Sequence, residues 1–301
     1  EMYEIFVIQS RNRYIKRAFS SYVPPALVKR LIHEPGGLNL KGEKREITLL
    51  FSDIRGFTSI SEKLSPEMLG MLLNDYLGAM TNILFKEKGT LDKYIGDAVM
   101  AIYNAPLDDP DHPILAVRTA ITMQSTLKEL NKRYQKQFNV DMRIGIGIHT
   151  GKAIVGNFGS PRRFNYTAMG DAVNLASRLE GQTKYYGVEI IISEGTLEGL
   201  GGAFMVRKLD KIRVKGKLEP VEIFQLFSEG ATPENTALAE KFDMAMESYY
   251  KGEFSTALNM LLDIEKFYPT DRPTQLMMER CQKFIEKPPE QWDGVHTATS
   301  K

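Results

Sequence analysis

Between Glu46 and Phe227 the sequence alternates short β-type runs with amphipathic helical segments, and this alternation limits the folds open to the chain. The apolar run Glu46–Asp53 is typical of a strand, whereas Asp111–Gln137 has the spacing of a long helix. Tight turns are predicted at Gly96-Asp97 and at Thr150-Gly151, each joining two strands. We therefore predict an α+β domain in which helices pack on one mainly antiparallel sheet.

The segment before this domain, residues 1–40, is predicted to be a helix followed by a linker. Its apolar residues from Ile5 to Tyr22 recur at three- and four-residue intervals, with Asn12 as the polar interruption. Two interpretations stay open. The helix either docks on its own domain or forms a parallel coiled coil that passes a signal into a dimer, with Asn12 in the core fixing the register.

After Ala231 the pattern becomes purely helical, so the predicted domains are 1–40, 41–230 and 231–301. Small, aromatic, apolar and proline positions in the last segment resemble one tetratricopeptide unit: Gly252, Phe254, Ala257, Leu261 and Pro269. A single unit cannot cover its own apolar face, so it must pack on the preceding domain or on another chain. The polar end from Asp293 to Lys301 is predicted to be a surface tail.

Charge and composition exclude several classes of function. The 39 Lys and Arg residues against 38 Asp and Glu leave a net charge of +1, so no nucleic-acid partner is expected. Apolar runs reach about six residues, far short of a membrane span, and no signal peptide is expected. The single cysteine, Cys281, cannot form an internal disulfide, which favours a reducing, cytoplasmic compartment. The chain begins at Glu1 and is expected to be part of a longer protein.

Two acidic residues stand at positions suited to a metal. Asp53 closes an apolar strand in FSDIRGFTSIS, and Asp97 lies in the turn of KYIGDAVMAIY. A strand end and a hairpin turn can meet at one edge of a sheet, and their oxygen ligands suit Mg²⁺. Taken alone, such a pair is more typical of a helix cap and a turn residue.

A third motif, FNYTAMGDAVNLASRLE, adds polar groups on a helix that Asp171 is predicted to cap. Asn174 and Arg178 are four residues apart and therefore project from one helix face. An amide and a guanidinium can orient a ribose and neutralise phosphoryl charge, although a solvated polar face has the same pattern.

The three motifs, in this order and spacing, resemble the catalytic domain of the class III adenylate cyclases over roughly residues 41–227. The resemblance implies a palm-type, ferredoxin-like domain that forms a head-to-tail homodimer with two sites at the interface. It also implies that Asp53 and Asp97 of one subunit hold two Mg²⁺ or Mn²⁺ ions, with the Ile54 backbone carbonyl as a further ligand.

The other half of each site would come from the second subunit. By resemblance, Lys93 and Thr167 bind the adenine edge, Asn174 positions the ribose, Arg178 stabilises charge at the α-phosphate and Lys215 holds the terminal phosphates. The implied reaction converts ATP to 3′,5′-cyclic AMP and pyrophosphate. Thr167 stands where many relatives have Asp, a departure shared with a bacterial branch of the family.

The flanks RAFSSYVPPALVKRL and RCQKFIEKPPEQWDGV are similar to those of cyclases with a membrane-anchored sensor, so this chain would be the cytoplasmic output half. Three alternatives remain: a guanylate cyclase, a non-catalytic cyclase-homology module that regulates another subunit, and an interaction protein built on the C-terminal helices. A diguanylate cyclase is not expected, because the sequence has no GGDEF-type turn.

Overall fold

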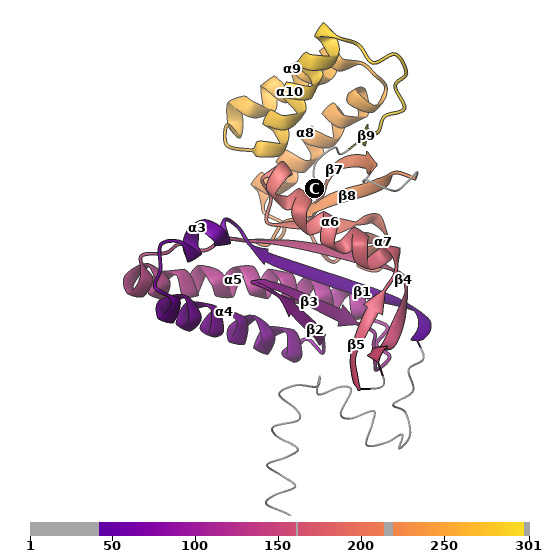
Figure 1. Cartoon of the computed structure of the whole chain (residues 1–301). Helices are drawn as coiled ribbons and strands as arrows, with labels where there is room; N and C mark the ends of the chain where they lie inside the picture. The colour runs from indigo at the N-terminus through magenta and orange to yellow at the C-terminus, as the bar shows by residue number, and fades with distance from the viewer. Residues whose placement is uncertain (1–41, 161, 214–218, 298–301) are drawn as a thin grey trace, which may run out of the picture.

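The computed structural model of the chain describes residues 42–160, 162–213 and 219–297, so the predicted N-terminal helix lies outside it. Among the described residues, nine strands form one sheet in the order β2-β3-β1-β4-β6-β8-β7-β9, with β5 paired to β4 (Figure 1). The strands are β1 (Gly42–Ile54), β2 (Thr90–Ile95), β3 (Ala98–Tyr103), β4 (Ile144–Ser160), β5 (Arg163–Met169), β6 (Ile190–Ser193), β7 (Val206–Arg213), β8 (Val221–Leu226) and β9 (His296–Thr297). The helices are α3 (Phe57–Ser61), α4 (Pro66–Lys86), α5 (His112–Phe138), α6 (Asp171–Tyr186), α7 (Glu194–Glu198), α8 (Pro233–Tyr250), α9 (Phe254–Phe267) and α10 (Arg272–Glu286).

The sheet is mainly antiparallel, which confirms the predicted α+β class. Only the β4–β6 and β7–β9 pairs are parallel among the described strands. The predicted turn at Gly96-Asp97 is present, since β2 and β3 pair antiparallel on either side of it.

The hairpin predicted at Thr150-Gly151 is wrong, because β4 runs through these residues without a break. Thr150 pairs with Thr48 and Gly151 with Ile47, so the long strand β1 supplies the partners that keep β4 extended. The Thr150 and Thr48 hydroxyls also hydrogen-bond at 2.7 Å between their Oγ1 atoms. The chain reverses further on, between Ser160 and the start of β5 at Arg163.

Helices cover both faces of the sheet, with α4 and α5 on one side and α6 on the other (Figure 1). Successive side chains of β1 point to opposite faces of the sheet, so β1 contributes to the hydrophobic core on both sides. Leu50 and Ile54 face α4 and α5, whereas Leu49 and Phe51 face α6. None of the described helices carries a stretch long and apolar enough to cross a bilayer.

Two glycines of β4 let α6 lie close to the sheet. A Cβ added at Gly147 would stand 2.2 Å from the backbone nitrogen of Glu180 and 2.6 Å from the carbonyl oxygen of Ala176. At Gly145 it would stand 2.2 Å from the Thr183 hydroxyl. Only a residue without a side chain fits beneath α6 at these two positions.

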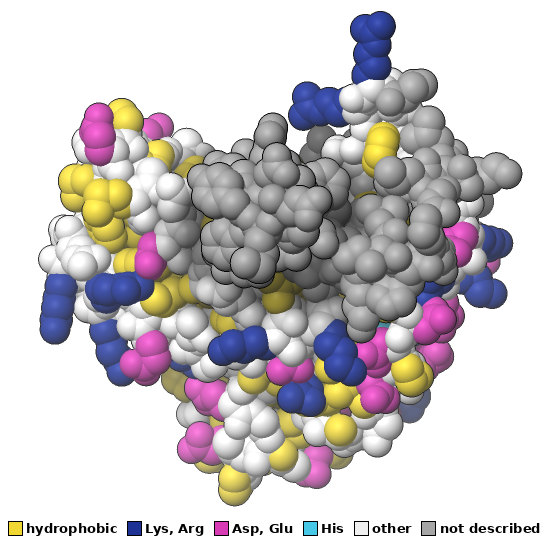
Figure 2. Space-filling view, turned by 90° about the horizontal axis from the view of Figure 1, so that it is seen from below, with side chains coloured by type: hydrophobic (Ala, Val, Ile, Leu, Met, Phe, Trp, Pro, Cys, Tyr) yellow, Lys and Arg dark blue, Asp and Glu magenta, His cyan; other side chains and the backbone are white. Residues whose placement is uncertain are grey.

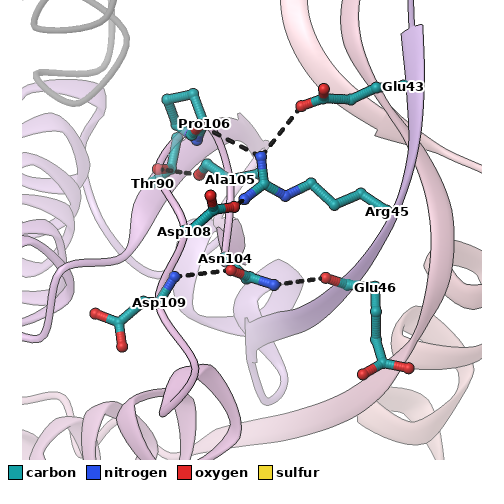
Figure 3. Close-up of polar contacts among 9 residues, drawn as sticks. All are labelled: Glu43, Arg45, Glu46, Thr90, Asn104, Ala105, Pro106, Asp108 and Asp109. Atoms are coloured by element: carbon teal, nitrogen blue, oxygen red, sulfur yellow. Dashed lines mark hydrogen bonds and ion pairs between the residues drawn. The ribbon is translucent and has the colours of Figure 1, made fainter.

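A polar cluster fastens the loop between β3 and α5 to the start of β1. Figure 3 shows Arg45 of β1 between Glu43, the Pro106 carbonyl and Asp108, with which it forms ion pairs and a hydrogen bond. Asn104 donates to the Glu46 carbonyl at 2.9 Å and accepts from the Asp109 amide at 2.8 Å. These contacts fix where α5 begins.

The helices α8, α9 and α10 enclose a core of their own and also pack on the sheet. Arg280 of α10 forms a buried ion pair with Asp210 of β7, and the Tyr186 hydroxyl of α6 donates to the same carboxylate at 2.6 Å. Arg207 of β7 is likewise paired with Asp271, at 2.9 Å. The segment thus covers its apolar face with its own helices and the preceding domain. Its tetratricopeptide character and the three domain boundaries stay predictions.

The surface tail predicted from Asp293 is wrong in part. Val295 is buried, and His296 pairs with Ile212 as β9 extends the sheet. Just before it, the Trp292 indole packs against Tyr249 and donates to that residue's carbonyl at 3.1 Å. Aromatic packing holds this end of the chain, whose polar composition would otherwise favour solvent.

Substituting Gly147→Ala should lower the free energy of unfolding by about 1–3 kcal/mol, because the new methyl group meets the backbone of α6, which cannot yield as a side chain would. Gly181→Ala is the control on α6 itself. A Cβ there meets nothing within 4 Å, so the change should stabilise by about 0.5–1 kcal/mol. Urea unfolding followed by circular dichroism measures both, and equal effects would contradict the close approach of α6.

Substituting Arg280→Ala should cost about 3–5 kcal/mol of stability, because it leaves the Asp210 carboxylate buried without its cation. The control Lys266→Ala breaks an exposed ion pair with Asp263 on α9 and should leave the unfolding midpoint unchanged. Denaturant unfolding gives the energies, and limited proteolysis shows whether α8–α10 detach. A wild-type midpoint for Arg280→Ala would show that this pair does not hold the two parts together.

Candidate active site

The carboxylates of Asp53 and Asp97 meet at one backbone amide. Asp53 lies at the end of β1 and Asp97 in the turn between β2 and β3. The Ile54 amide donates to Asp53 Oδ1 at 3.0 Å and to Asp97 Oδ2 at 3.3 Å. The predicted convergence of these two acids at a sheet edge is therefore present.

The site keeps two acidic side chains close together, and both are only half exposed to water. Burial first, and then the hydrogen bond and charge of Asp97, raise the pKa of Asp53 to about 6. A divalent cation would relieve this repulsion, and carboxylate oxygens are the ligands that Mg²⁺ and Mn²⁺ prefer. The described residues hold no group of three or more His, Cys, Asp or Glu suited to a metal. The pair therefore fits ions that complete their coordination with water and substrate oxygens.

Glu180 of α6 is a third carboxylate near this pair, and no sequence pattern indicates its position. Its Oε1 lies 3.1 Å from where a Gly145 Cβ would stand, and Gly145 pairs with Asp53. Burial and the charge of Asp53 raise the pKa of Glu180 to about 7, against the opposing charge of Arg55. Only the packing of α6 on β4 places it there.

A second polar group joins β2 to β5. Lys93 Nζ donates to the Thr167 hydroxyl at 3.1 Å, so the structure brings together the two residues predicted to bind a base. Asp92 is part of the same group. Its fully buried carboxylate accepts from the Thr167 hydroxyl at 2.5 Å and lies 3.3 Å from Lys93 Nζ. Sequence reasoning missed Asp92, because neighbouring residues of a regular strand point to opposite faces.

Asn174 and Arg178 both lie on α6, as predicted. Asn174 is exposed and Arg178 half-buried, whereas Leu175 and Leu179 on the same helix are buried. The helix begins at Asp171 with Gly170 as its N-cap, so the predicted cap is wrong by one residue. Gly170 has φ +131°, a conformation that side chains disfavour, and this explains why the cap is a glycine.

The described residues therefore form two polar groups on one chain. The acidic group contains Asp53, Ile54 and Asp97, and the base group contains Asp92, Lys93 and Thr167. Lys93 and Asp97 are four residues apart, yet one contacts β5 and the other β1. Lys215 lies outside the described residues.

Comparison with known proteins places this arrangement in a family. Residues 40–228 match the family model of the adenylate and guanylate cyclase catalytic domain. An adenylate cyclase of Anabaena cylindrica is 37% identical over 226 residues, which are 73% of this chain and 43% of that protein. The chain thus spans less than half the length of this relative.

Two solved structures are similar to the chain over the same domain. The adenylyl cyclase CyaB from P. aeruginosa has a TM-score of 0.59 and 39% identity, covering 62% of this chain and 96% of that one. The guanylyl cyclase Cya2 has a TM-score of 0.57 and 37% identity, covering 62% and 93%. With the family model matching most of the chain, the chain belongs to the adenylate and guanylate cyclase catalytic domain family.

Proposed function

We propose that this chain is an adenylate cyclase that converts ATP to 3′,5′-cyclic AMP and pyrophosphate. The observation that carries the proposal is the pair of polar groups on one chain. Asp53 and Asp97 converge on a single amide, and Lys93 contacts Thr167. Family membership and the names of the Anabaena and P. aeruginosa relatives support the same activity.

The acidic group is the proposed metal site. Asp53, Asp97 and the Ile54 carbonyl would hold two Mg²⁺ or Mn²⁺ ions, and the raised pKa of Asp53 fits a site whose charge a cation balances. When bound, the ions supply the positive charge that activates the ribose 3′-hydroxyl and stabilises the leaving pyrophosphate.

The remaining residues bind and orient ATP. Lys93 donates to adenine N1, and Thr167 accepts from the exocyclic amine. Asn174 positions the ribose, Arg178 stabilises the charge that develops at the α-phosphate, and Lys215 holds the terminal phosphates. The exposure of Asn174 on the outer side of α6 supports a ligand-binding role, because packing does not require an amide there.

We further propose a homodimer in which each site takes the acidic group from one subunit, and the base group together with Asn174, Arg178 and Lys215 from the other. Lys93 and Asp97 turn toward different strands, which supports a divided site. Large apolar side chains are also exposed on β2 and β5, which carry Lys93 and Thr167, and on the neighbouring strand β4, as expected of an interface. They are Tyr94 and Ile95 of β2, Ile154 of β4, and Phe164 and Met169 of β5.

The compartment and the context of the chain are proposals as well. We propose a cytoplasmic location, supported by the buried free thiol of Cys281, and an upstream membrane-anchored sensor, supported by the similarity of the flanks. No nucleic-acid partner is proposed. Figure 2 shows basic and acidic side chains interspersed over one face of the described residues.

The first test is turnover by the purified chain with ATP or GTP, in Mg²⁺ or Mn²⁺, over a range of protein concentrations. We expect cyclic AMP from ATP, with specific activity rising as the dimer forms. Asp53→Ala should lower kcat by at least about 100-fold, since it removes a metal ligand. Asp263→Asn, at an exposed carboxylate on α9, is the control and should keep full activity.

Two outcomes of this assay would redirect the proposal. Cyclic GMP as the main product would favour the guanylate cyclase alternative, which the similarity to Cya2 keeps open. No cyclic product from folded, dimeric protein would favour the non-catalytic module.

The divided site predicts complementation between inactive subunits. Asp53→Ala and Arg178→Ala should each be nearly inactive as homodimers. Their purified heterodimer contains one intact site and should recover about half of the wild-type activity. The heterodimer is purified through a different affinity tag on each subunit. The control is a dimer purified in the same way in which both subunits carry Asp53→Ala. Failure of the mixed heterodimer to recover would indicate sites contained within single chains.

A further inference from the structure

Under the proposed function, on which this inference rests, the Thr167 hydroxyl takes part in distinguishing adenine from guanine. A threonine hydroxyl can donate one hydrogen bond and accept two, so by itself it suits the amine of adenine and the carbonyl of guanine alike. What the hydroxyl does depends on where its proton is held.

Asp92 holds that proton. Thr167 Oγ1 donates to Asp92 Oδ2 at 2.5 Å, whereas its other acceptor, the Ala168 carbonyl, is 3.5 Å away. The Asp92 side chain is 0% exposed, and the Ala168 amide donates to the same Oδ2 at 3.4 Å. An ionised carboxylate accepts hydrogen bonds and donates none, so it commits the hydroxyl proton and leaves Thr167 as an acceptor toward a ligand.

A β-bulge makes this arrangement possible. The pairing of β2 with β3 shifts between Leu91 and Lys93, which leaves Asp92 as the extra residue. In a regular strand, residues 92 and 93 would point to opposite faces of the sheet. With the bulge, Asp92 and Lys93 both reach the Thr167 hydroxyl, one as its acceptor and the other as its donor.

The group therefore offers a ligand a fixed pattern. The Lys93 ammonium has three N–H donors, donates one hydrogen bond to Thr167 and forms an ion pair with Asp92 Oδ1 at 3.3 Å, so among the described residues it keeps a donor for a ligand. Thr167 keeps one lone pair. An acceptor beside a donor matches the amine and N1 of adenine, whereas guanine presents a carbonyl and an N–H in the reverse order.

We propose that Asp92 is a positioning residue that sets the preference for ATP over GTP by fixing the Thr167 hydroxyl as a hydrogen-bond acceptor. It does not touch the base itself. It acts through Thr167, so its substitution should change the ratio of ATP to GTP activity, which a residue that only supports the fold would leave unchanged.

The test is the ratio of kcat/KM for ATP to that for GTP in the full chain, measured from cyclic AMP and cyclic GMP. Asp92→Asn should lower the ratio about tenfold, because its amide can donate to Thr167 and release the hydroxyl proton toward a guanine carbonyl. Thr167→Val should also lower the ratio. The double variant should match Thr167→Val alone, since Asp92 acts through that hydroxyl.

The matched control is Asp75→Asn, another aspartate that accepts from a hydroxyl, that of Tyr134 at 2.7 Å, and the ratio should stay at the wild-type value. Equal losses of kcat/KM for both nucleotides in Asp92→Asn would overturn the proposal, as would an additive effect in the double variant. Asp92→Ala is a second substitution, expected to lower the ratio as well. If thermal melting shows that neither variant folds, Asp92 is structural and the proposal is wrong.

If the proposed function itself is wrong, the wild-type chain makes no cyclic nucleotide from ATP or GTP. Binding then tests Asp92 independently, by displacement of a fluorescent nucleotide with ATP or GTP in Ca²⁺. A wild-type preference for ATP that falls in Asp92→Asn supports the inference without turnover, and an unchanged preference overturns it.

Discussion

The antiparallel pairing of β1 with β4 is the constraint on which the rest of the structure depends. It runs without interruption from the Gly42–Gly156 pair to the Ile54–Ile144 pair. This ladder holds Asp53 at a fixed end of a buried strand and sets Gly145 and Gly147 beneath α6. A slip of one residue would turn every side chain of β1 to the opposite face, so register and site are specified together.

The helix α6 connects this ladder to the proposed chemistry. It can approach β4 only because Gly145 and Gly147 have no side chains, and it carries Asn174 and Arg178 on its outer side. Its far end is tied to the C-terminal helices through Tyr186, Asp210 and Arg280. The C-terminal segment is therefore part of the support of α6, and a change in its packing would act on the helix that carries two of the proposed substrate contacts.

The polar groups show how position sets chemical behaviour. Asp53 shares an amide with a second carboxylate, and its raised pKa suits a cation. Asp92 accepts a hydrogen bond from Thr167 and forms an ion pair with Lys93. Aspartate thus has two roles in this protein. Asp53, beside a second carboxylate, is suited to binding a metal ion, whereas Asp92, which accepts a hydrogen bond from Thr167, orients that hydroxyl.

The fold class and several elements that carry the proposed site residues could be predicted from the sequence alone. Hydrophobic periodicity predicts the α+β class, the strand that ends at Asp53, the turn at Asp97 and the helix of Asn174 and Arg178, because these patterns are local. Tertiary structure decided what depends on partners distant in the chain. Thr150-Gly151 stays extended because β1 pairs with it, and Trp292 is half-buried because it packs on Tyr249 of α8. Glu180 lies near the acidic group only because α6 packs on β4, and Asp92 belongs to the base group only because of a bulge in β2. No local sequence pattern indicates either contact.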